Sequence, residues 1–559
     1  MSRTYPRQAQ KSSARVATAP KSEPEETNLL QQLQHLVQIS LGFLGESLPL
    51  GIGCGLLGLI FYFAVSDKVG LAVGAGSFAM ILSWRHPQGA LWFFFLYMPF
   101  GGTVTYWLAG GNALFQLAKD AFYVPALLSI FMAISRTRKQ TFLKPQSILP
   151  SLWLLVSFCI LSLLFVSLPR QFSEGGALFA QGILGMKVLV GYIPLIFLLQ
   201  IIIPTQRELW IFNRVHVLLA IVCCLLCLVQ YLFLTTGRCA GTDHLSGADL
   251  FEATLEAKCF VGGALVYSPS QGVIRLPGPF VAPWQWGWFL IGNAYLTFAG
   301  AFADPSWRWR LVGFVGMGTV TMAAVICGQR IALALVPVSF ILLLVLTGQL
   351  VNLKRLIPIL VGSIVVGLVA WFQYQSVILE RIASFQGRWE ASPADDMIAF
   401  QFSFVWRAIQ GSELLLGKGL GSATNSARIF GKTALIETWF PKLLFETGVL
   451  GTFIFLIFVT VLTIFTFIVY RRLHDRNLRT LAACYWVFIL FISYQTYYYP
   501  LDVDPVAVYY WALAGIIFRL RDLDRQLMEA ENTPTDGSVE PKTIKPRFAP
   551  MRQGIGNRE

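Results

Sequence analysis

Apolar stretches of about twenty residues recur along almost the whole chain, and they decide what it can fold into. In lipid every backbone polar group must be satisfied internally, so a stretch of about 20 apolar residues crosses a bilayer as an α-helix. The sequence predicts about fourteen such spans, the third and fourth interrupted by glycines, near 47–65, 69–84, 90–107, 119–134, 149–168, 182–203, 215–234, 284–303, 309–327, 331–347, 355–372, 447–470, 479–498 and 505–519. We therefore expect an all-α, polytopic integral membrane protein.

The balance of composition and charge agrees with this class. Of the 559 residues, 55% are hydrophobic and only 13% are charged. The net charge of +13 does not indicate a nucleic-acid partner, because the basic residues concentrate in short loops and tails, as membrane orientation requires. With the N-terminus inside, the inner loops are the basic ones. This pattern places both termini in the cytoplasm and two long loops, 235–283 and 373–446, outside.

The two ends of the chain are polar. Residues 1–27 and 521–559 are too polar to bury a core, and we expect them to be disordered cytoplasmic tails. Residues 28–46 place leucines on one helical face, which predicts an amphipathic helix lying on the inner membrane surface or packed on the protein. Residues 47–520 then form the transmembrane domain.

The second outer loop, 373–446, is the least membrane-like stretch between the first and last spans. It is long and charged, yet it has aromatic and apolar residues at helical spacing. Long loops in compact proteins are usually functional or disordered. We interpret this one as a folded cap over an active site. Its Asp395-Asp396 pair suits a hard cation or, more simply, a solvated turn.

The cysteines separate into two groups. Seven of the nine lie within predicted spans and behave as small apolar residues. Cys239 and Cys259 both fall in the first outer loop, where an oxidising compartment allows a disulfide. Two free thiols remain the alternative.

Arginines gather in the parts of the chain that face outward. Arg275 precedes a stiff Pro-Gly-Pro turn, Arg330 begins a span at its outer end, and Arg388 and Arg407 lie in the cap. A guanidinium fork binds two phosphate oxygens at once, so these residues suit a pyrophosphate headgroup at the membrane surface. Lys187, near the outer end of a span, is a weaker candidate for the same role. For Lys187 and Arg330 the simpler alternative is snorkelling to the interface.

Trp406 and Trp439 alternate with these arginines and offer faces on which sugar rings can stack. Glu437 stands just before the chain re-enters the membrane and could deprotonate or orient an acceptor hydroxyl, although a capping or surface role is the alternative.

The sequence carries no legible metal site and no nucleotide motif, so we expect no metal and no cofactor. A transfer outside the membrane then needs a donor that is already activated, and a sugar on a lipid pyrophosphate fits this requirement.

Three patches of sequence resemble the O-antigen ligase and polymerase superfamily, whose members are polytopic glycosyltransferases that act on undecaprenyl-pyrophosphate-linked glycans. The first, Arg275 to Gly287, is similar to the family's Arg-x-x-Gly-x-Phe-x-x-Pro element. The second is a turn in which Gln329 replaces the family's Ser before Arg330. The third runs from a Trp through Gly-x-Gly-x-Gly to Glu-x-Gly, at Trp406, Gly417, Gly419, Gly421, Glu446 and Gly448. The tails and size are also similar to cyanobacterial exopolysaccharide proteins, including those for hormogonium polysaccharide.

Two departures from the family pattern bear on the activity. Ligases of the family place a His nine residues before the Glu, where this chain has Glu437, and often an Arg four residues before the Trp, where it has Phe402. The first departure favours a polymerase, and the second leaves Arg388 or Arg407 to supply the missing charge.

The expectation is therefore a metal-independent, polymerase-type glycosyltransferase of the bacterial inner membrane. It would move a polyprenyl-pyrophosphate-linked oligosaccharide onto an acceptor glycan, with Gln329 beside the sugars and other polysaccharide-assembly proteins as possible partners. A ligase that transfers finished glycan to a terminal acceptor is the nearest alternative. A polysaccharide or lipid transporter is the alternative from another class, but the chain shows no internal repeat and its charges gather at the outer face.

Overall fold

The computed structural model describes residues 47–111, 113–137, 145–250, 254–269, 272–349 and 394–532, with isolated positions between 372 and 390. The predicted tail 1–27, the amphipathic helix 28–46 and the predicted span 355–372 lie outside the described residues. The chain separates into two compact units, one ending at Leu82 and the other beginning at Ser83, and each is described by itself.

The first unit is a pair of helices packed through glycines. The helix Ser47–Ala64 is followed by α2 (Asp67–Arg85), whose end continues into the second unit. A Cβ atom on Gly58 would lie 2.9 Å from the carbonyl oxygen of Gly70 and 3.0 Å from the Cα of Gly74. The absence of side chains at these positions lets the two backbones approach closely, as small residues do in membrane helix pairs.

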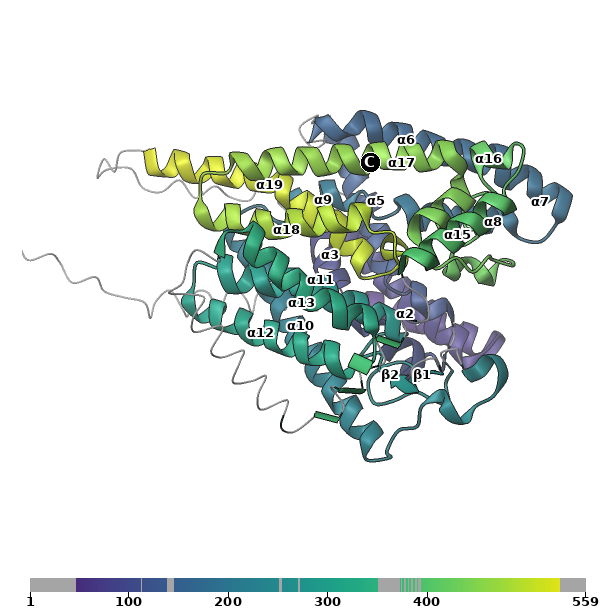
Figure 1. Ribbon diagram of the computed structural model, residues 1–559. Coiled ribbons are helices and arrows are strands. Elements are labelled where there is room, and N and C mark those ends of the chain that lie inside the picture. The colour runs from purple at the N-terminus through teal and green to yellow at the C-terminus, as the bar shows by residue number, and fades with distance from the viewer. Residues whose placement is uncertain are drawn as a thin grey trace, which may run out of the picture. The chain divides into compact units, whose positions relative to one another are not determined.

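The described part of the second unit is mostly helical and contains one short β-hairpin (Figure 1). Its first half contains α3 (Pro87–Tyr97), α4 (Gly101–Thr103), α5 (Asp120–Thr137), α6 (Leu149–Ser162), α7 (Leu168–Glu174), α8 (Leu178–Val190), α9 (Leu195–Ile202) and α10 (Gln206–Thr235). Short 3-10 or π turns join several of these helices and include η2 (Val104–Leu108) and η6 (Leu163–Ser167). The strands β1 (Val266–Ser268) and β2 (Val273–Arg275) pair antiparallel, with Val266 opposite Arg275.

Further helices form the second half of this unit. These are α11 (Pro283–Ala303), α12 (Trp307–Ile326), α13 (Arg330–Leu346), α15 (Ala394–Ala408), α16 (Glu413–Leu416), α17 (Trp439–Arg472), α18 (Arg476–Tyr494) and α19 (Val506–Asn532). The turn η11 (Pro500–Asp502) precedes α19. Helix α19 continues to Asn532, so the prediction of a disordered tail from residue 521 is wrong for its first turns.

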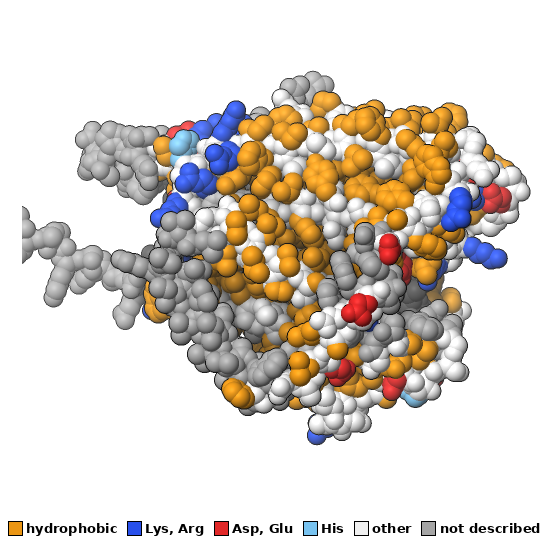
Figure 2. All heavy atoms as spheres, in the orientation of Figure 1, with side chains coloured by type: hydrophobic (Ala, Val, Ile, Leu, Met, Phe, Trp, Pro, Cys, Tyr) orange, Lys and Arg blue, Asp and Glu red, His pale blue; other side chains and the backbone are white. Residues whose placement is uncertain are grey.

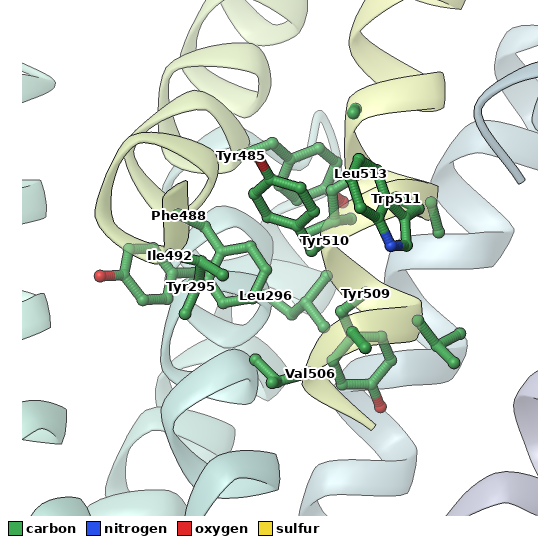
Figure 3. Packing of buried hydrophobic residues seen from close by; sticks show 14 of the residues in the cluster. Tyr295, Leu296, Tyr485, Phe488, Ile492, Val506, Tyr509, Tyr510, Trp511 and Leu513 are labelled. Atoms are coloured by element: carbon green, nitrogen blue, oxygen red, sulfur yellow. The ribbon is translucent and has the colours of Figure 1, made fainter. Parts of the chain in front are cut away.

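The core of the second unit lies where α11, α18 and α19 meet. Figure 3 shows Tyr295 and Leu296 of α11 packed with Phe488 and Ile492 of α18 and with aromatic side chains of α19. Nearly every residue of α11 is buried. A central helix of this kind is shielded from lipid by its neighbours, so it tolerates the Gln, Asn, Gly and Trp residues that lower its hydropathy.

Among the described residues, seven helices are long and apolar enough to cross a membrane, or eight if the bent pair α8 and α9 is one span. The architecture is therefore that of an all-α membrane protein, while the predicted count of fourteen is not confirmed. The predicted span 182–203 is α8 and α9 with a bend of 52° between them. The predicted span 90–107 is broken into α3, α4 and short turns, which agrees with its interrupting glycines.

The surface of this unit is apolar over much of its extent. Figure 2 shows hydrophobic side chains covering the middle of the visible face, with most of the visible basic side chains at its upper left and a few at its right. Exposed apolar residues such as Phe453 on α17 and Ile341 on α13 contribute to this kind of surface. Large exposed apolar areas on a folded protein mark a membrane or partner surface.

Candidate functional site

Glu437 is brought to its position by a backbone contact between two segments far apart in the sequence. Thr438, just before α17, bridges to Tyr497 and Tyr498, just after α18, and the amide of Trp439 donates to the carbonyl of Thr496 at 2.8 Å. The start of helix α17 therefore lies beside the end of helix α18. Half-buried Glu437 lies beside the aromatic run that follows α18.

Arg275 lies at the end of the β-hairpin, close to Glu437 and Tyr498. Burial lowers the pKa of the Arg275 guanidinium, and the nearby Tyr498 and Glu437 oppose this shift. The Nε of Arg275 has no hydrogen-bond partner among the described residues. A cation that burial has partly desolvated, and whose Nε has no hydrogen-bond partner among the described residues, attracts an anionic ligand.

The loop that carries Arg275 is held by several independent contacts. Cys239 and Cys259 form a disulfide, as the sequence allowed. Gly278 has a φ of 55°, which suits glycine, and its carbonyl accepts a hydrogen bond from Gln230 at 2.9 Å. A Cβ atom on Gly278 would lie 2.8 Å from the ring of Trp286. The Pro-Gly-Pro turn therefore packs closely against α11. This contact and the hydrogen bond from Gln230 hold the loop that carries Arg275.

Gln329 and Arg330 come next to Arg275 through a second backbone contact. The amide of Leu276 donates to the carbonyl of Cys327 at 2.9 Å, just before the turn that starts α13. Gln329 is buried, and its Nε2 has no hydrogen-bond partner among the residues described. Two of the family-like patches noted in the sequence are therefore neighbours in space.

A buried ion pair lies on the other side of Glu437. Lys442 on the second turn of α17 pairs with Asp502 of η11, and both side chains are almost fully buried. Burial raises the pKa of Asp502 to about 6, with Lys442 opposing that shift. The Lys442 ammonium also lies 5.6 Å from the centre of the Tyr499 ring. This pair ties α17 to the turn that follows Tyr498.

Lys187 is engaged in a separate ionic network. Its ammonium lies 2.9 Å from Asp120, and Lys119 lies 2.9 Å from Asp504. Although burial acts to raise the pKa of Asp504, Lys119 and Lys187 outweigh it and hold that pKa below its ordinary value. The predicted role of Lys187 in binding pyrophosphate therefore competes with a visible one, which is to pair with Asp120 of α5.

The Gly-x-Gly-x-Gly turn of the cap serves close packing. A Cβ atom on Gly421 would lie 2.2 Å from the carbonyl oxygen of Gln181, and one on Gly185 would lie 2.1 Å from the amide nitrogen of Gly421. The buried carboxylate of Glu446 accepts hydrogen bonds from the amide of Ala423 and the hydroxyl of Thr424. Glu446 and these glycines join the cap to α8 and α17.

The other predicted residues are spread over the cap. Residues 394–446 are folded around a small core that includes Val405, Ile409 and Ile436. Arg407 is exposed and donates to the carbonyl of Ser403 in its own helix, so the structure does not bring it to Arg275. Trp406 is exposed, as a stacking surface requires.

Trp439 is buried and packs edge-on against Phe455, so it has no face open to a sugar ring. Arg388 lies outside the described residues.

Several buried polar atoms at this place have no hydrogen-bond partner among the described residues. They are Arg275 Nε, Gln329 Nε2, Thr438 Oγ1, Trp439 Nε1 and Asp502 Oδ1. Buried polar groups in folded proteins are normally satisfied, so a group of unsatisfied ones indicates a place that receives a ligand or water. We call the meeting point of Arg275, Gln329, Arg330, Glu437 and Tyr498 the Arg275 site.

The sequence analysis missed Tyr498 and assigned no role to Asp502 or Asp504. Tyr498 has a φ of 59°, which is rare for a residue with a side chain and is often found at functional positions. Burial raises the pKa of Tyr498 above its ordinary value. The sequence signal that was available is the run of three tyrosines ending at Tyr499, because three polar aromatic residues beside a proline are unusual for a solvated turn.

The Arg275 site combines a buried cation, a carboxylate and a neutral phenol in one region outside the long apolar helices. Such a set can bind an anionic group and accept a proton from a hydroxyl near it. No protein-family model matches this chain, and no curated protein matches it significantly.

Proposed function

We propose that the chain is a polymerase-type glycosyltransferase that moves an oligosaccharide from a polyprenyl pyrophosphate onto a sugar hydroxyl of an acceptor glycan. The observation that carries the proposal is the buried Arg275 guanidinium, whose Nε has no partner among the described residues, next to Glu437. The resemblance to the O-antigen ligase and polymerase superfamily supports the choice of donor and acceptor.

In the proposed reaction the acceptor hydroxyl oxygen attacks the anomeric carbon of the donor sugar. A new glycosidic C–O bond forms while the bond between that carbon and the pyrophosphate oxygen breaks. Glu437 takes the hydroxyl proton, and the lipid pyrophosphate leaves with the bonding electron pair. Arg275 and Arg330 stabilise the negative charge that develops on the leaving group. Lys187 pairs with Asp120 of α5, so it acts as a positioning residue.

The proposal includes a membrane arrangement. The chain would cross the inner membrane of a bacterium about fourteen times, with both termini in the cytoplasm and the Arg275 site outside. The bias of basic residues toward the loops on one side supports this orientation. Trp406 and the cap would lie over the site and contact the sugars.

Glycan length in cells tests the function. Wild type is compared with Arg275→Lys, Arg330→Lys and Glu437→Gln at equal protein level, since lysine keeps the charge but loses the fork that binds two oxygens. We expect single repeat units to accumulate on the lipid carrier. With purified protein and lipid-linked oligosaccharide, the rate should fall by about 10²–10³ for the arginines and 10²–10⁴ for Glu437. Arg238→Lys, an exposed arginine in the same outer loop, is the matched control and should leave chain length unchanged.

The same experiment separates the alternatives. Long chains that stay on the carrier and never reach a final acceptor would identify a ligase. Normal chain length and normal attachment in all three variants would refute the assignment of the Arg275 site and favour a transporter.

A further inference from the structure

A cavity of about 420 Å³ opens at the other end of the long helices, away from the Arg275 site. It is lined by the residues that follow α13, by Tyr470 near the end of α17, and by Arg476, Arg479 and Thr480 at the start of α18. Helix α17 spans 34 residues between Trp439 and this end, with a kink at Gly448, whose φ is 67°. With a rise of about 1.5 Å per residue, the helix separates the cavity from the Arg275 site by tens of ångströms.

The cavity offers two positive charges that nothing in the described protein neutralises. Arg476 and Arg479 are three residues apart on one helix face, and neither guanidinium has an ion-pair or hydrogen-bond partner among the described residues. Acidic groups nearby are already engaged. Asp475 accepts from the amide of Leu478 at 2.7 Å, and Asp524 accepts from the amides of His474 and Asp475.

The other polar groups of the cavity have limited capacity as donors. The hydroxyls of Thr347 and Thr480 donate to carbonyls of their own helices, at 2.6 Å and 2.9 Å. Gln349 is 6% exposed, and its Oε1 has no hydrogen-bond partner among the described residues. The strong donors are therefore the two guanidinium groups, while Gln349 is a buried acceptor that needs a donor.

The cavity lies at the boundary between apolar helix and charged loop. Figure 2 shows most of the visible basic side chains at the upper left of the visible face, beside the hydrophobic area. Arg471 and Arg472 end α17 and belong to the same end of the molecule as Arg476 and Arg479. Lipid phosphates lie at this depth of a bilayer, and an aromatic residue such as Tyr470 is common there.

We infer that this cavity binds a phosphate group through Arg476 and Arg479, with Gln349 accepting a hydrogen bond from a hydroxyl or amine of the same ligand. The forks of two arginines suit phosphate oxygens, and the volume falls in the range of small-molecule sites. The ligand is the headgroup of an anionic lipid or a small soluble phosphate compound. Both present the same phosphate to the two arginines. This site is independent of the proposed glycosyl transfer.

The test uses the full-length protein in detergent, with thermal unfolding and native mass spectrometry as readouts. The probes are a short-chain phosphatidylglycerol, a short-chain phosphatidylcholine and inorganic phosphate. We expect saturable binding that Arg476→Gln with Arg479→Gln weakens by about a hundredfold, since two charge-assisted contacts are lost and each is worth about tenfold or more. The matched control is Arg471→Gln with Arg472→Gln, which removes the same charge from the same end without touching the cavity lining.

The outcomes are distinct. Binding of phosphatidylglycerol but not of inorganic phosphate supports the site and identifies a lipid headgroup as the source. Binding of inorganic phosphate in competition with the lipid supports the site with a soluble ligand. Equal weakening in the two double variants would overturn the inference, because the arginines would then act only as surface charge. Absence of saturable binding by every probe would overturn it as well.

Discussion

Lys442 and Asp502 show how much a single side chain contributes to the geometry of the Arg275 site. The two charges are almost fully buried, and they join α17 to the turn that follows Tyr498. Removal of one partner leaves the other charge buried and unpaired, which costs far more than the pair contributes. The chemistry proposed for Glu437 depends on this ion pair. The pair holds the segment that carries Glu437 close to the segment that carries Tyr498.

We predict that Lys442→Met lowers the free energy of unfolding by about 3–5 kcal/mol. The variant leaves the buried carboxylate of Asp502 without its cation, and an unpaired buried charge is destabilising. The double variant Lys442→Met with Asp502→Leu should recover most of the loss, because no charge is left behind. Thermal unfolding of purified protein at fixed detergent concentration measures both. If Lys442→Met is as stable as wild type, water must reach the ion pair, and the prediction is wrong.

The pH dependence of stability offers a second prediction for the same carboxyl. Burial raises the pKa of Asp502 from 3.8 to about 6, against the opposing effect of Lys442 and with small contributions from Glu446 and Asp504. The folded state therefore binds this proton more tightly than the unfolded state does. The stabilising contribution is complete below pH 3.8 and is lost as the pH rises through about 6.

Asp502→Asn has no proton to bind at this position. The difference in melting temperature between wild type and Asp502→Asn should shift in favour of wild type as the pH falls from about 7 to about 5. Asp243→Asn, in an exposed loop, is the control for general loss of a carboxyl. A constant difference across this range would contradict the raised pKa.

At the scale of elements, the close contact between α8 and the glycine turn of the cap decides how the cap is held. Gly185 and Gly421 leave no room for a side chain on either backbone. Because the cap is joined to the spans at this contact, a change there should affect the whole protein. The contact accounts for the glycine at 421, whereas a Cβ atom on Gly417 would meet the backbone of Glu446 and one on Gly419 would meet Ser167.

We predict that Gly185→Ala destabilises the protein by about 1–3 kcal/mol, as overpacking in tight interiors does. The added Cβ would lie 2.1 Å from a backbone nitrogen, which cannot move as a side chain can. The matched control is Gly318→Ala in α12, where no atom lies within 4 Å of the added group. That variant should be neutral or gain about 0.5–1 kcal/mol, because alanine favours helix. Melting temperatures of the two variants compare them directly, and equal values would disprove the packing argument.

The sequence predicted those features that depend on a single stretch of the chain, and it could not predict contacts between distant stretches. Long apolar helices such as Gln206–Thr235 follow from hydropathy, and the Cys239–Cys259 bridge follows from shared placement in one outer loop. The closeness of Arg275 to Glu437 was suggested by resemblance, but no local pattern determines it. It depends on the contact of Thr438 with Tyr498, between residues some sixty positions apart. The partner of Lys187 was hidden for the same reason, because Asp120 comes from another helix.

At the scale of the whole molecule, the two ends of the long helices differ in chemistry. The Arg275 site holds buried polar atoms that lack hydrogen-bond partners among the described residues, while the cavity at the start of α18 holds exposed arginines. A membrane protein with such a division should present its two ends to different compartments. Chemical labelling in intact cells can measure which end faces the outside.

We predict that a membrane-impermeant maleimide labels His244→Cys in intact cells, whereas Arg472→Cys reacts only after the membrane is permeabilised. Both positions are exposed, and the first outer loop and the α17–α18 turn lie on opposite sides in the proposed orientation. The background should be low because the free cysteines among the described residues are buried and Cys239 is bonded to Cys259. The reverse labelling pattern would invert the orientation and place the Arg275 site in the cytoplasm.

The contact of Thr438 with Tyr497 and Tyr498 has a consequence for how this protein can evolve. Helices α17 and α18 start and finish at that contact, so their lengths are coupled. One residue inserted into either helix turns everything beyond it by about 100° and moves Glu437 away from Tyr498. Natural relatives should therefore keep the lengths of these two helices constant and accept insertions in the turn 473–475. Where residue 438 changes, residues 497 and 498 should change with it.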